Sequence, residues 1–177
     1  SLAFSRDGKT LCSAGDDGHV RVWDVDTGSE RYVLGPFEGE IWPVACSPRD
    51  EVVAAGGHGP KIRIWDLTSG RRLHELTQHE DNITSLCFSA DGQTLVSTSH
   101  DRTIRLWDVA TGSEIRPPLG GHAGDVQYAV FSPDGNRLAL EIDNSRQSDI
   151  WIYEWATDTL DRLTFDRAND RYPVWSP

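Results

Sequence analysis

The chain has 177 residues with 28 acidic and 17 basic side chains, so its formal net charge at pH 7 is −11. This length can bury a hydrophobic core, and the acidic excess argues against nucleic acid or an anionic membrane as the main partner, because both bind clustered Lys and Arg. Three cysteines without CxxC spacing and no apolar run of membrane-spanning length argue against a disulfide framework, a zinc site and a transmembrane helix, and favour a cytoplasmic protein.

Short runs of β-branched and aromatic residues, separated by Asp-Gly and other turn sequences, recur along the chain. Counted in order, they make four units of four predicted strands at about residues 1–35, 36–77, 78–119 and 120–165. A further predicted strand at Tyr172–Ser176 begins a fifth unit at about 166–177. The third unit has the plainest runs, at Ile83–Ser89, Thr94–Thr98, Thr103–Asp108 and Glu114–Leu119. No long stretch has helical periodicity, so the sequence predicts an all-β fold.

Three sequence markers repeat with nearly the same period. A Trp-Asp pair recurs every 42 residues, at Trp23-Asp24, Trp65-Asp66 and Trp107-Asp108. A serine ends the first run of each unit, at Ser5, Ser47, Ser89, Ser132 and Ser176. A glycine turn follows each Trp-Asp pair, at Gly28, Gly70 and Gly112. A period of this length indicates one supersecondary unit that is repeated along the chain.

These motifs resemble those of the WD-repeat (WD40) family. The resemblance rests on the Trp-Asp pairs, on Gly121-His122 with the looser Gln78-His79, and on Ser-Pro-Asp-Gly at 132–135. It implies a β-propeller, in which four-stranded antiparallel blades stand radially around a channel. Four blades and one extra strand indicate a segment of a larger propeller, with a four-bladed ring or self-association of two chains as the alternatives.

The fourth unit departs from the WD pattern. Tyr153-Glu154 stands where Trp-Asp is expected, and it follows Trp107 by 46 residues. Three of its segments resemble the TolB-type propeller repeat instead: Ser148–Glu154, Arg162–Phe165 and Tyr172–Pro177. Both repeat types build propeller blades, so the expected fold is unchanged.

Histidine, serine and aspartate in the third unit invite comparison with a catalytic triad. The WD resemblance implies instead a structural hydrogen-bonded tetrad of His79, Ser97, Asp101 and Trp107, which satisfies buried polar groups. The same positions hold Ser13, Asp17 and Trp23 in the first unit. In the second unit Trp65 remains, while Phe37, Ala55 and Gly59 replace the others. The fourth unit keeps His122 but has Leu140 at the serine position.

One face of the expected propeller carries acidic loops. Its carboxylates are Asp16, Asp17, Glu38, Glu40, Glu80, Asp81, Asp125, Asp143, Asp149, Asp166 and Asp170, against the fewer cations Arg102, Arg146, Arg167 and Arg171. Trp42 begins the first run of its unit, where other units have Thr84, Gln127 and Arg171, and this ring resembles the partner-contacting rim of WD propellers. The expected partner-binding residues are Trp42, Glu40, Glu80, Asp81, Thr84, His100, Arg102, Asp125, Gln127 and Arg171.

We therefore expect a non-catalytic scaffold that binds a protein or peptide of basic or mixed charge, with no nucleic acid, membrane, metal or cofactor. No GxSxG, HExxH, phosphate-loop or dinucleotide motif is present, and the histidines lack metal-ligand spacing. Cys12, Cys46 and Cys87 lie among apolar strand residues and are expected to be buried and inert. The alternative function is a sensory or accessory segment of a larger bacterial signalling kinase or peptidase.

Overall fold

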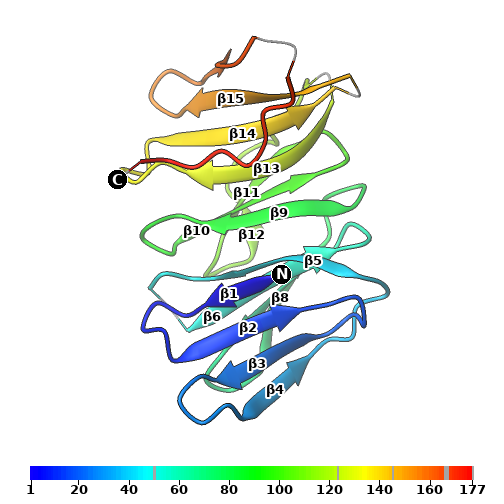
Figure 1. The fold of residues 1–177 in the computed structure, drawn as a ribbon, viewed down its shortest axis with the longest axis vertical. Helices are drawn as coiled ribbons and strands as arrows, with labels where there is room; N and C mark the ends of the chain where they lie inside the picture. The colour runs from blue at the N-terminus through cyan, green and yellow to red at the C-terminus, as the bar shows by residue number, and fades with distance from the viewer. Residues whose placement is uncertain (50, 123, 145, 166–167, 177) are drawn as a thin grey trace.

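The computed structural model describes residues 1–49, 51–122, 124–144, 146–165 and 168–176. Within these ranges the regular structure is sixteen β-strands in four sheets of four, with no helix (Figure 1). No helix in the described ranges is therefore long and apolar enough to cross a membrane. The all-β fold of four-stranded antiparallel sheets predicted from the sequence is confirmed.

Each sheet is an antiparallel meander whose strands pair in chain order. The first sheet consists of β1 (Leu2–Phe4), β2 (Thr10–Ala14), β3 (Val20–Asp24) and β4 (Glu30–Leu34). The second consists of β5 (Ile41–Cys46), β6 (Val52–Gly57), β7 (Ile62–Asp66) and β8 (Arg72–Leu76). The third consists of β9 (Ile83–Phe88), β10 (Thr94–Ser99), β11 (Ile104–Asp108) and β12 (Ser113–Glu114). The fourth consists of β13 (Asp125–Phe131), β14 (Arg137–Asp143), β15 (Ser148–Glu154) and β16 (Thr159–Arg162).

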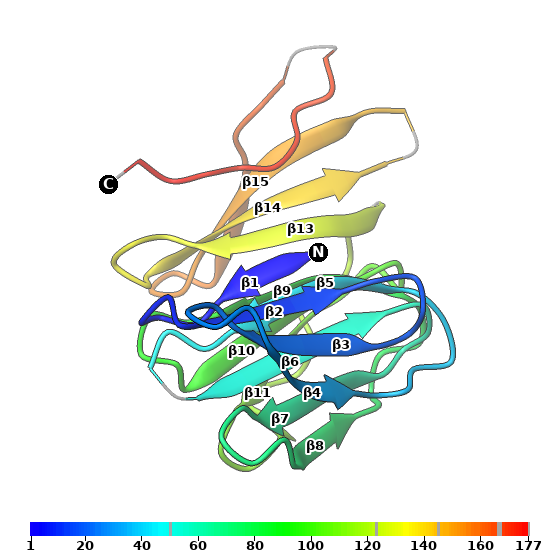
Figure 2. The same cartoon turned by 60° about the horizontal axis from the view of Figure 1, so that its bottom comes forward.

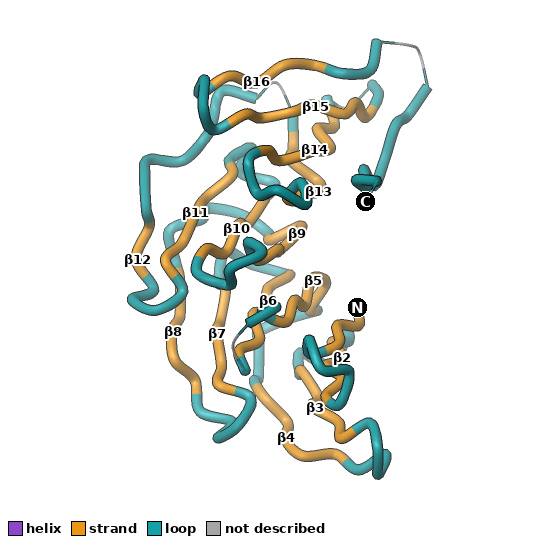
Figure 3. Tube along the Cα trace, turned by 90° about the vertical axis from the view of Figure 1, so that its left-hand side faces the viewer, coloured by secondary structure: helices purple, strands orange, loops and turns teal. Residues whose placement is uncertain are grey.

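The four sheets fan out from a common hub as propeller blades. Figure 2 shows β1, β5 and β9 close together, with β4 and β8 on the far side of their sheets. In Figure 3 the outer strands spread into an open arc, while β5, β9 and β13 lie at its inner side. The first strand of each blade therefore faces the hub, which is where a shared site can form.

The hydrophobic core lies between neighbouring blades in three clusters. Cys12 and Val22 of the first blade pack with Val53 and Trp65 of the second. The next two clusters join the second blade to the third and the third to the fourth. Because successive strand residues point to opposite faces, a blade with neighbours on both sides is buried on both faces. The strand β6 is accordingly buried along its whole length.

The aspartate of each Trp-Asp pair fixes the turn that follows it. The Asp24 carboxylate accepts hydrogen bonds from the backbone N–H and the hydroxyl of Thr27, both at 2.9 Å. Asp108 accepts the same two bonds from Thr111, both at 2.8 Å. The glycine of the turn, Gly112, has φ +69°, a conformation that favours a residue without Cβ. Hydrogen bonds and glycine conformation within each turn thus determine the geometry of the repeated turns.

Two predicted strands differ from the structure. The run expected to extend to Leu119 ends at Glu114, because the prolines at 117 and 118 have no backbone N–H to pair, and a single bridge joins Leu119 to Ile104. The strand predicted at Tyr172–Ser176 is absent from the structure, where Tyr172 has φ 52°, outside the extended region, and Pro173 has no backbone N–H to pair. Asp166, Arg167 and Pro177 of the expected fifth unit lie outside the described residues.

Candidate functional site

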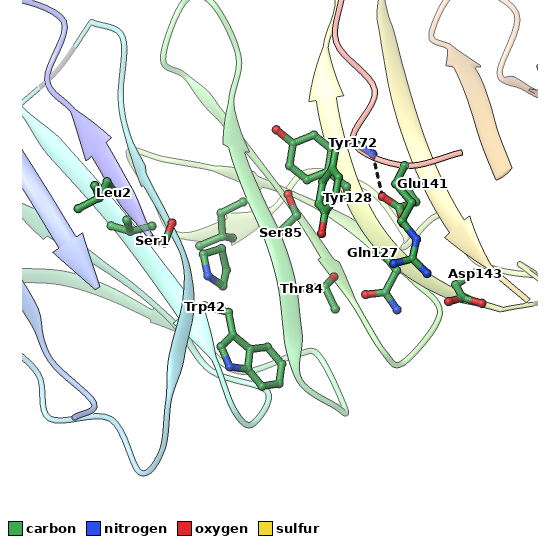
Figure 4. Close-up of a pocket in the computed structure, with 14 residues that line it drawn as sticks. Ser1, Leu2, Trp42, Thr84, Ser85, Gln127, Tyr128, Glu141, Asp143 and Tyr172 are labelled. Carbon is green, nitrogen blue, oxygen red and sulfur yellow. Dashed lines mark hydrogen bonds and ion pairs between the residues drawn. The ribbon is translucent and has the colours of Figure 1, made fainter. Parts of the chain in front are cut away.

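The inner strands of the blades line a cavity of about 600 Å³ at the hub (Figure 4). Its walls are Ser1, Leu2, Trp42, Pro43, Val44, Thr84, Ser85, Leu86, Gln127, Tyr128, Glu141, Asp143, Arg171 and Tyr172. Four residues of the predicted partner-binding set are among them: Trp42, Thr84, Gln127 and Arg171. The structure therefore brings together the ring of positions that the sequence repeats select.

A backbone irregularity at one repeated position aims these side chains into the hub. The pairing of β9 with β10 shifts register between Ser85 and Ile83, which leaves Thr84 as the extra residue. The pairing of β13 with β14 shifts in the same way at Gln127. The pairing of β5 with β6 shifts between Ile41 and Val44, a stretch that contains Trp42. Such β-bulges redirect side chains, and here they let consecutive residues of one strand line the same cavity.

Trp42 lies on the rim of the cavity with about a third of its surface exposed. Its indole Nε1 donates a hydrogen bond to the Glu40 carboxylate at 3.1 Å. Its ring is tilted against the imidazole of His100 in the next blade, with 6.2 Å between the ring centroids. The exposed indole is thus held from two sides while leaving an apolar surface open.

The opposite wall is built by residues that the sequence analysis did not select. Tyr128 and Tyr172 meet edge to face with their ring centroids 6.0 Å apart. The buried carboxylate of Glu141 accepts a hydrogen bond from the backbone N–H of Tyr172 at 3.0 Å and lies 3.8 Å from the Arg171 guanidinium (Figure 4). Tyr128 directly follows Gln127 in sequence, so extending the predicted ring by one residue could have found it.

The other predicted partner-binding residues lie outside the cavity lining. Glu80 and Asp81 are exposed on the loop before β9. Arg102 and Asp125 form an ion pair at 3.7 Å between the third and fourth blades. Asp149, counted with the acidic loops, is instead buried, and its carboxylate accepts a hydrogen bond from Arg162 at 2.7 Å. Asp166 and Arg167 fall outside the described residues.

The third blade contains the complete predicted tetrad. His79 Nδ1 donates to the Asp101 carboxylate at 2.6 Å, and the Ser97 hydroxyl donates to His79 Nε2 at 2.7 Å. The indole N–H of Trp107 donates to the Ser97 oxygen at 2.8 Å. Burial opposes ionisation of Asp101, but hydrogen bonds from His79 and Thr103 prevail and lower its pKa. The His79, Ser97 and Trp107 side chains are buried, so the network joins loop to strand without presenting a nucleophile to solvent.

The first and second blades carry incomplete versions of this network. In the first, Trp23 Nε1 donates to the Ser13 hydroxyl at 2.9 Å, while Asp17 pairs with Arg21 at 2.8 Å. In the second, apolar packing replaces hydrogen bonds, since the ring of Phe37 lies 5.9 Å from that of Trp65.

The fourth blade keeps the histidine without its partner. His122 Nε2 is buried and has no hydrogen-bond partner among the described residues, since Leu140 stands where the third blade has Ser97. Burial lowers the pKa of His122 and favours its neutral form. This histidine therefore lacks the serine contact that His79 makes in the third blade. Among the residues that the structure describes, no His, Cys, Asp and Glu side chains form a group of three or more that could hold a metal ion.

Comparison with known proteins agrees with the blade architecture. The WD40 family model, described as WD domain, G-beta repeat, matches residues 1–24 and 70–108. The guanine nucleotide-exchange factor SEC12 of Rattus norvegicus is 36% identical over 55 residues, which cover 31% of this chain and 13% of the rat protein. The family match ends at residue 108, so the TolB-like character of the fourth unit stays a prediction. The WD40 family model thus matches two regions of the chain, and the four antiparallel four-stranded sheets have the arrangement of propeller blades.

Proposed function

We propose that this chain is a non-catalytic scaffold that binds a segment of a partner protein, or a peptide, at the hub cavity. WD40 repeats generally mediate protein–protein interaction, and the matched repeats support this class of function. The observation that carries the proposal is the Trp42 indole, which is exposed at the rim of the cavity and is held on a strand of the blade scaffold. Binding sites commonly sit on such exposed positions of a rigid framework.

The lining of the cavity suits a side chain with an apolar stem and a polar end. Trp42, Tyr128 and Tyr172 offer large apolar surfaces with polar tips. Thr84, Gln127 and Ser85 add hydroxyl and amide groups between them. Buried aromatic anchors surrounded by polar groups supply most of the free energy of binding at protein interfaces.

The charges near the rim favour a partner of basic or mixed charge. Glu40 lies beside Trp42, and Glu80 and Asp81 are exposed on a nearby loop. The cations of this face are partly offset, because Arg102 pairs with Asp125. A negative rim attracts basic segments and raises their association rate, while the aromatic contact sets the affinity.

Peptides selected from a random display library on the intact chain test this proposal. We expect the selected peptides to be rich in Lys and Arg, and Trp42→Ala to weaken their binding by roughly 30-fold, the loss typical of an aromatic hot spot. Phe165→Ala is the matched control, because this exposed aromatic residue does not line the cavity. Dissociation constants from fluorescence anisotropy are the measurement. Equal dissociation constants for Trp42→Ala and the wild-type chain would show that the peptide does not bind at the hub cavity.

A further inference from the structure

Two cysteines from neighbouring blades lie at the same interface in the core. Cys12 of β2 is fully buried in the first blade, and Cys46 of β5 is half-buried in the second. Cys12 belongs to the cluster that joins these blades, and Cys46 packs against that cluster. The Cys46 sulfur lies 3.7 Å from the carbonyl oxygen of Ala3, and Ala3 is the strand partner of Cys12. The sulfur of Cys46 is thus placed at the strand pair that carries Cys12.

The same two positions hold apolar pairs at the other blade interfaces. Cys46 directly precedes a repeated serine, where the third and fourth blades have Phe88 and Phe131. Cys12 matches Ala54 and Val96, each 42 residues further along. Ala54 belongs to the second cluster and Val96 to the third, and Phe88 and Phe131 pack against these clusters in the same order. Two thiols therefore replace an aliphatic–phenylalanine pair at one interface of the three.

We propose that Cys12 and Cys46 form a thiol-oxidation site whose product is a disulfide between the first and second blades. The oxidant is of the hydroperoxide class, with hydrogen peroxide as the simplest member. This assignment replaces the inert state expected for these two cysteines from the sequence. It rests on contacts within the core and is independent of what binds at the hub.

The reaction needs two steps and no further reagent. The Cys46 thiolate attacks one peroxide oxygen, the O–O bond breaks, and Cys46 becomes a sulfenic acid as the other oxygen leaves as hydroxide, which takes up the thiol proton and becomes water. The Cys12 sulfur then attacks the Cys46 sulfur, the S–O bond breaks, and a second water leaves with the proton of Cys12. Two thiols are oxidised to one disulfide, and one hydrogen peroxide is reduced to two waters.

The surroundings distinguish the attacking thiol from the resolving thiol. Cys46 is half-buried and Cys12 is fully buried, so Cys46 is the thiol that peroxide can reach. Cys87 packs at the interface of the third and fourth blades, and burial raises its pKa to about 12. Cys87 is half-buried like Cys46, but it lies at a blade interface that holds no second cysteine, so it is an internal reference that should form no disulfide.

Peptide mapping after peroxide treatment of the intact, reduced protein tests the proposal. Trypsin places Cys12 in the peptide 10–21, Cys46 in 32–49 and Cys87 in 73–102. We expect 10–21 to be linked to 32–49, and alkylation after unfolding in urea to label all three cysteines of the untreated protein but only Cys87 of the oxidised protein. Dithiothreitol should restore all three labels. Cys87→Ser should form the same link, whereas Cys46→Ser should form none.

Other products would overturn the proposal. A sulfinic acid on Cys46 with Cys12 still free would show that the two sulfurs do not meet, and a link to Cys87 would show a different pairing. Peroxide that leaves all three thiols free in the folded protein, but oxidises them in urea, would show that the site is closed to oxidant. The wild-type map decides among these results without any variant, so failure of Cys46→Ser to fold would not affect the test.

Discussion

Two histidines at equivalent positions differ in their hydrogen bonding because one neighbouring residue differs between the blades. His79 donates to Asp101 and accepts from Ser97, so both ring nitrogens are satisfied in the third blade. His122 has Leu140 in place of that serine, and its Nε2 has no partner. A buried polar atom without a partner costs free energy, whereas a completed network stabilises the surrounding turn and strand. The tetrad positions therefore stabilise the third blade more than the fourth.

Replacing the tetrad serine should cost more in the third blade than in the first. Ser97→Ala leaves His79 Nε2 and Trp107 Nε1 unpaired in the core, so we expect a loss of about 1–3 kcal/mol in the free energy of unfolding. Ser13→Ala leaves only the partly buried Trp23 Nε1 unpaired, and we expect a loss below about 1 kcal/mol. Urea unfolding followed by circular dichroism measures both variants. A loss for Ser13→Ala equal to or above that for Ser97→Ala would contradict the argument.

The turn after each Trp-Asp pair is the element that the repeat preserves best. The aspartate fixes the first half of the turn through its hydrogen bonds, and a glycine with positive φ completes it. The neighbours of these glycines differ along the chain. A Cβ at Gly28 would meet nothing within 4 Å, whereas one at Gly112 would lie 2.6 Å from His74 Nδ1 of the second blade. Turns that are equivalent in sequence are thus unequal in packing.

Alanine at these two glycines separates backbone strain from steric conflict. Gly28→Ala carries the cost of positive φ only, and we expect it to lower the free energy of unfolding by about 1 kcal/mol. Gly112→Ala carries the same cost and displaces the His74 ring, so we expect about 2–3 kcal/mol. Urea unfolding midpoints of the two variants provide the comparison. Equal midpoints would mean that the His74 ring moves aside freely.

At the scale of the whole molecule, stability is distributed among blade interfaces and repeated acidic turns. The pKa values of the turn aspartates are lowered by hydrogen bonds, as for Asp66 beside Ser69, Asp108 beside Thr111 and Asp134 beside Ser132. For Asp24 the contact with Arg31 is the main cause, and the pKa falls to about 2. Each depressed pKa means that the folded chain binds protons less readily than the unfolded chain.

Stability should therefore fall as the solution is acidified. Carboxylates with depressed pKa stabilise the fold above their unfolded pKa of about 4, and this contribution is lost as the pH falls from about 4 toward 2. We expect the urea midpoint to decrease over this range. Because the loss arises from short-range hydrogen bonds, high salt should leave most of it in place. A midpoint that stays constant down to pH 3 would show that these contacts contribute little.

The sequence alone was sufficient for the local features of the chain. The period of the Trp-Asp pairs and the Asp-Gly turns predicted strands and four-stranded blades, because turn chemistry and alternation act between near neighbours. The same period selected Trp42, Thr84 and Gln127 as equivalent positions. It did not anticipate the left-handed conformation of Tyr172, at the start of a predicted strand that the structure lacks.

The tertiary structure decided everything that depends on contacts between blades. The register shifts that turn Trp42, Thr84 and Gln127 toward one cavity arise from strand pairing, and they are invisible in the repeat pattern. The packing of Cys12 and Cys46 at one interface likewise brings together residues from different blades. A repeat specifies each blade through local interactions, but the cavity and the thiol pair form only where separate blades pack, so their geometry depends on distances that no sequence spacing encodes.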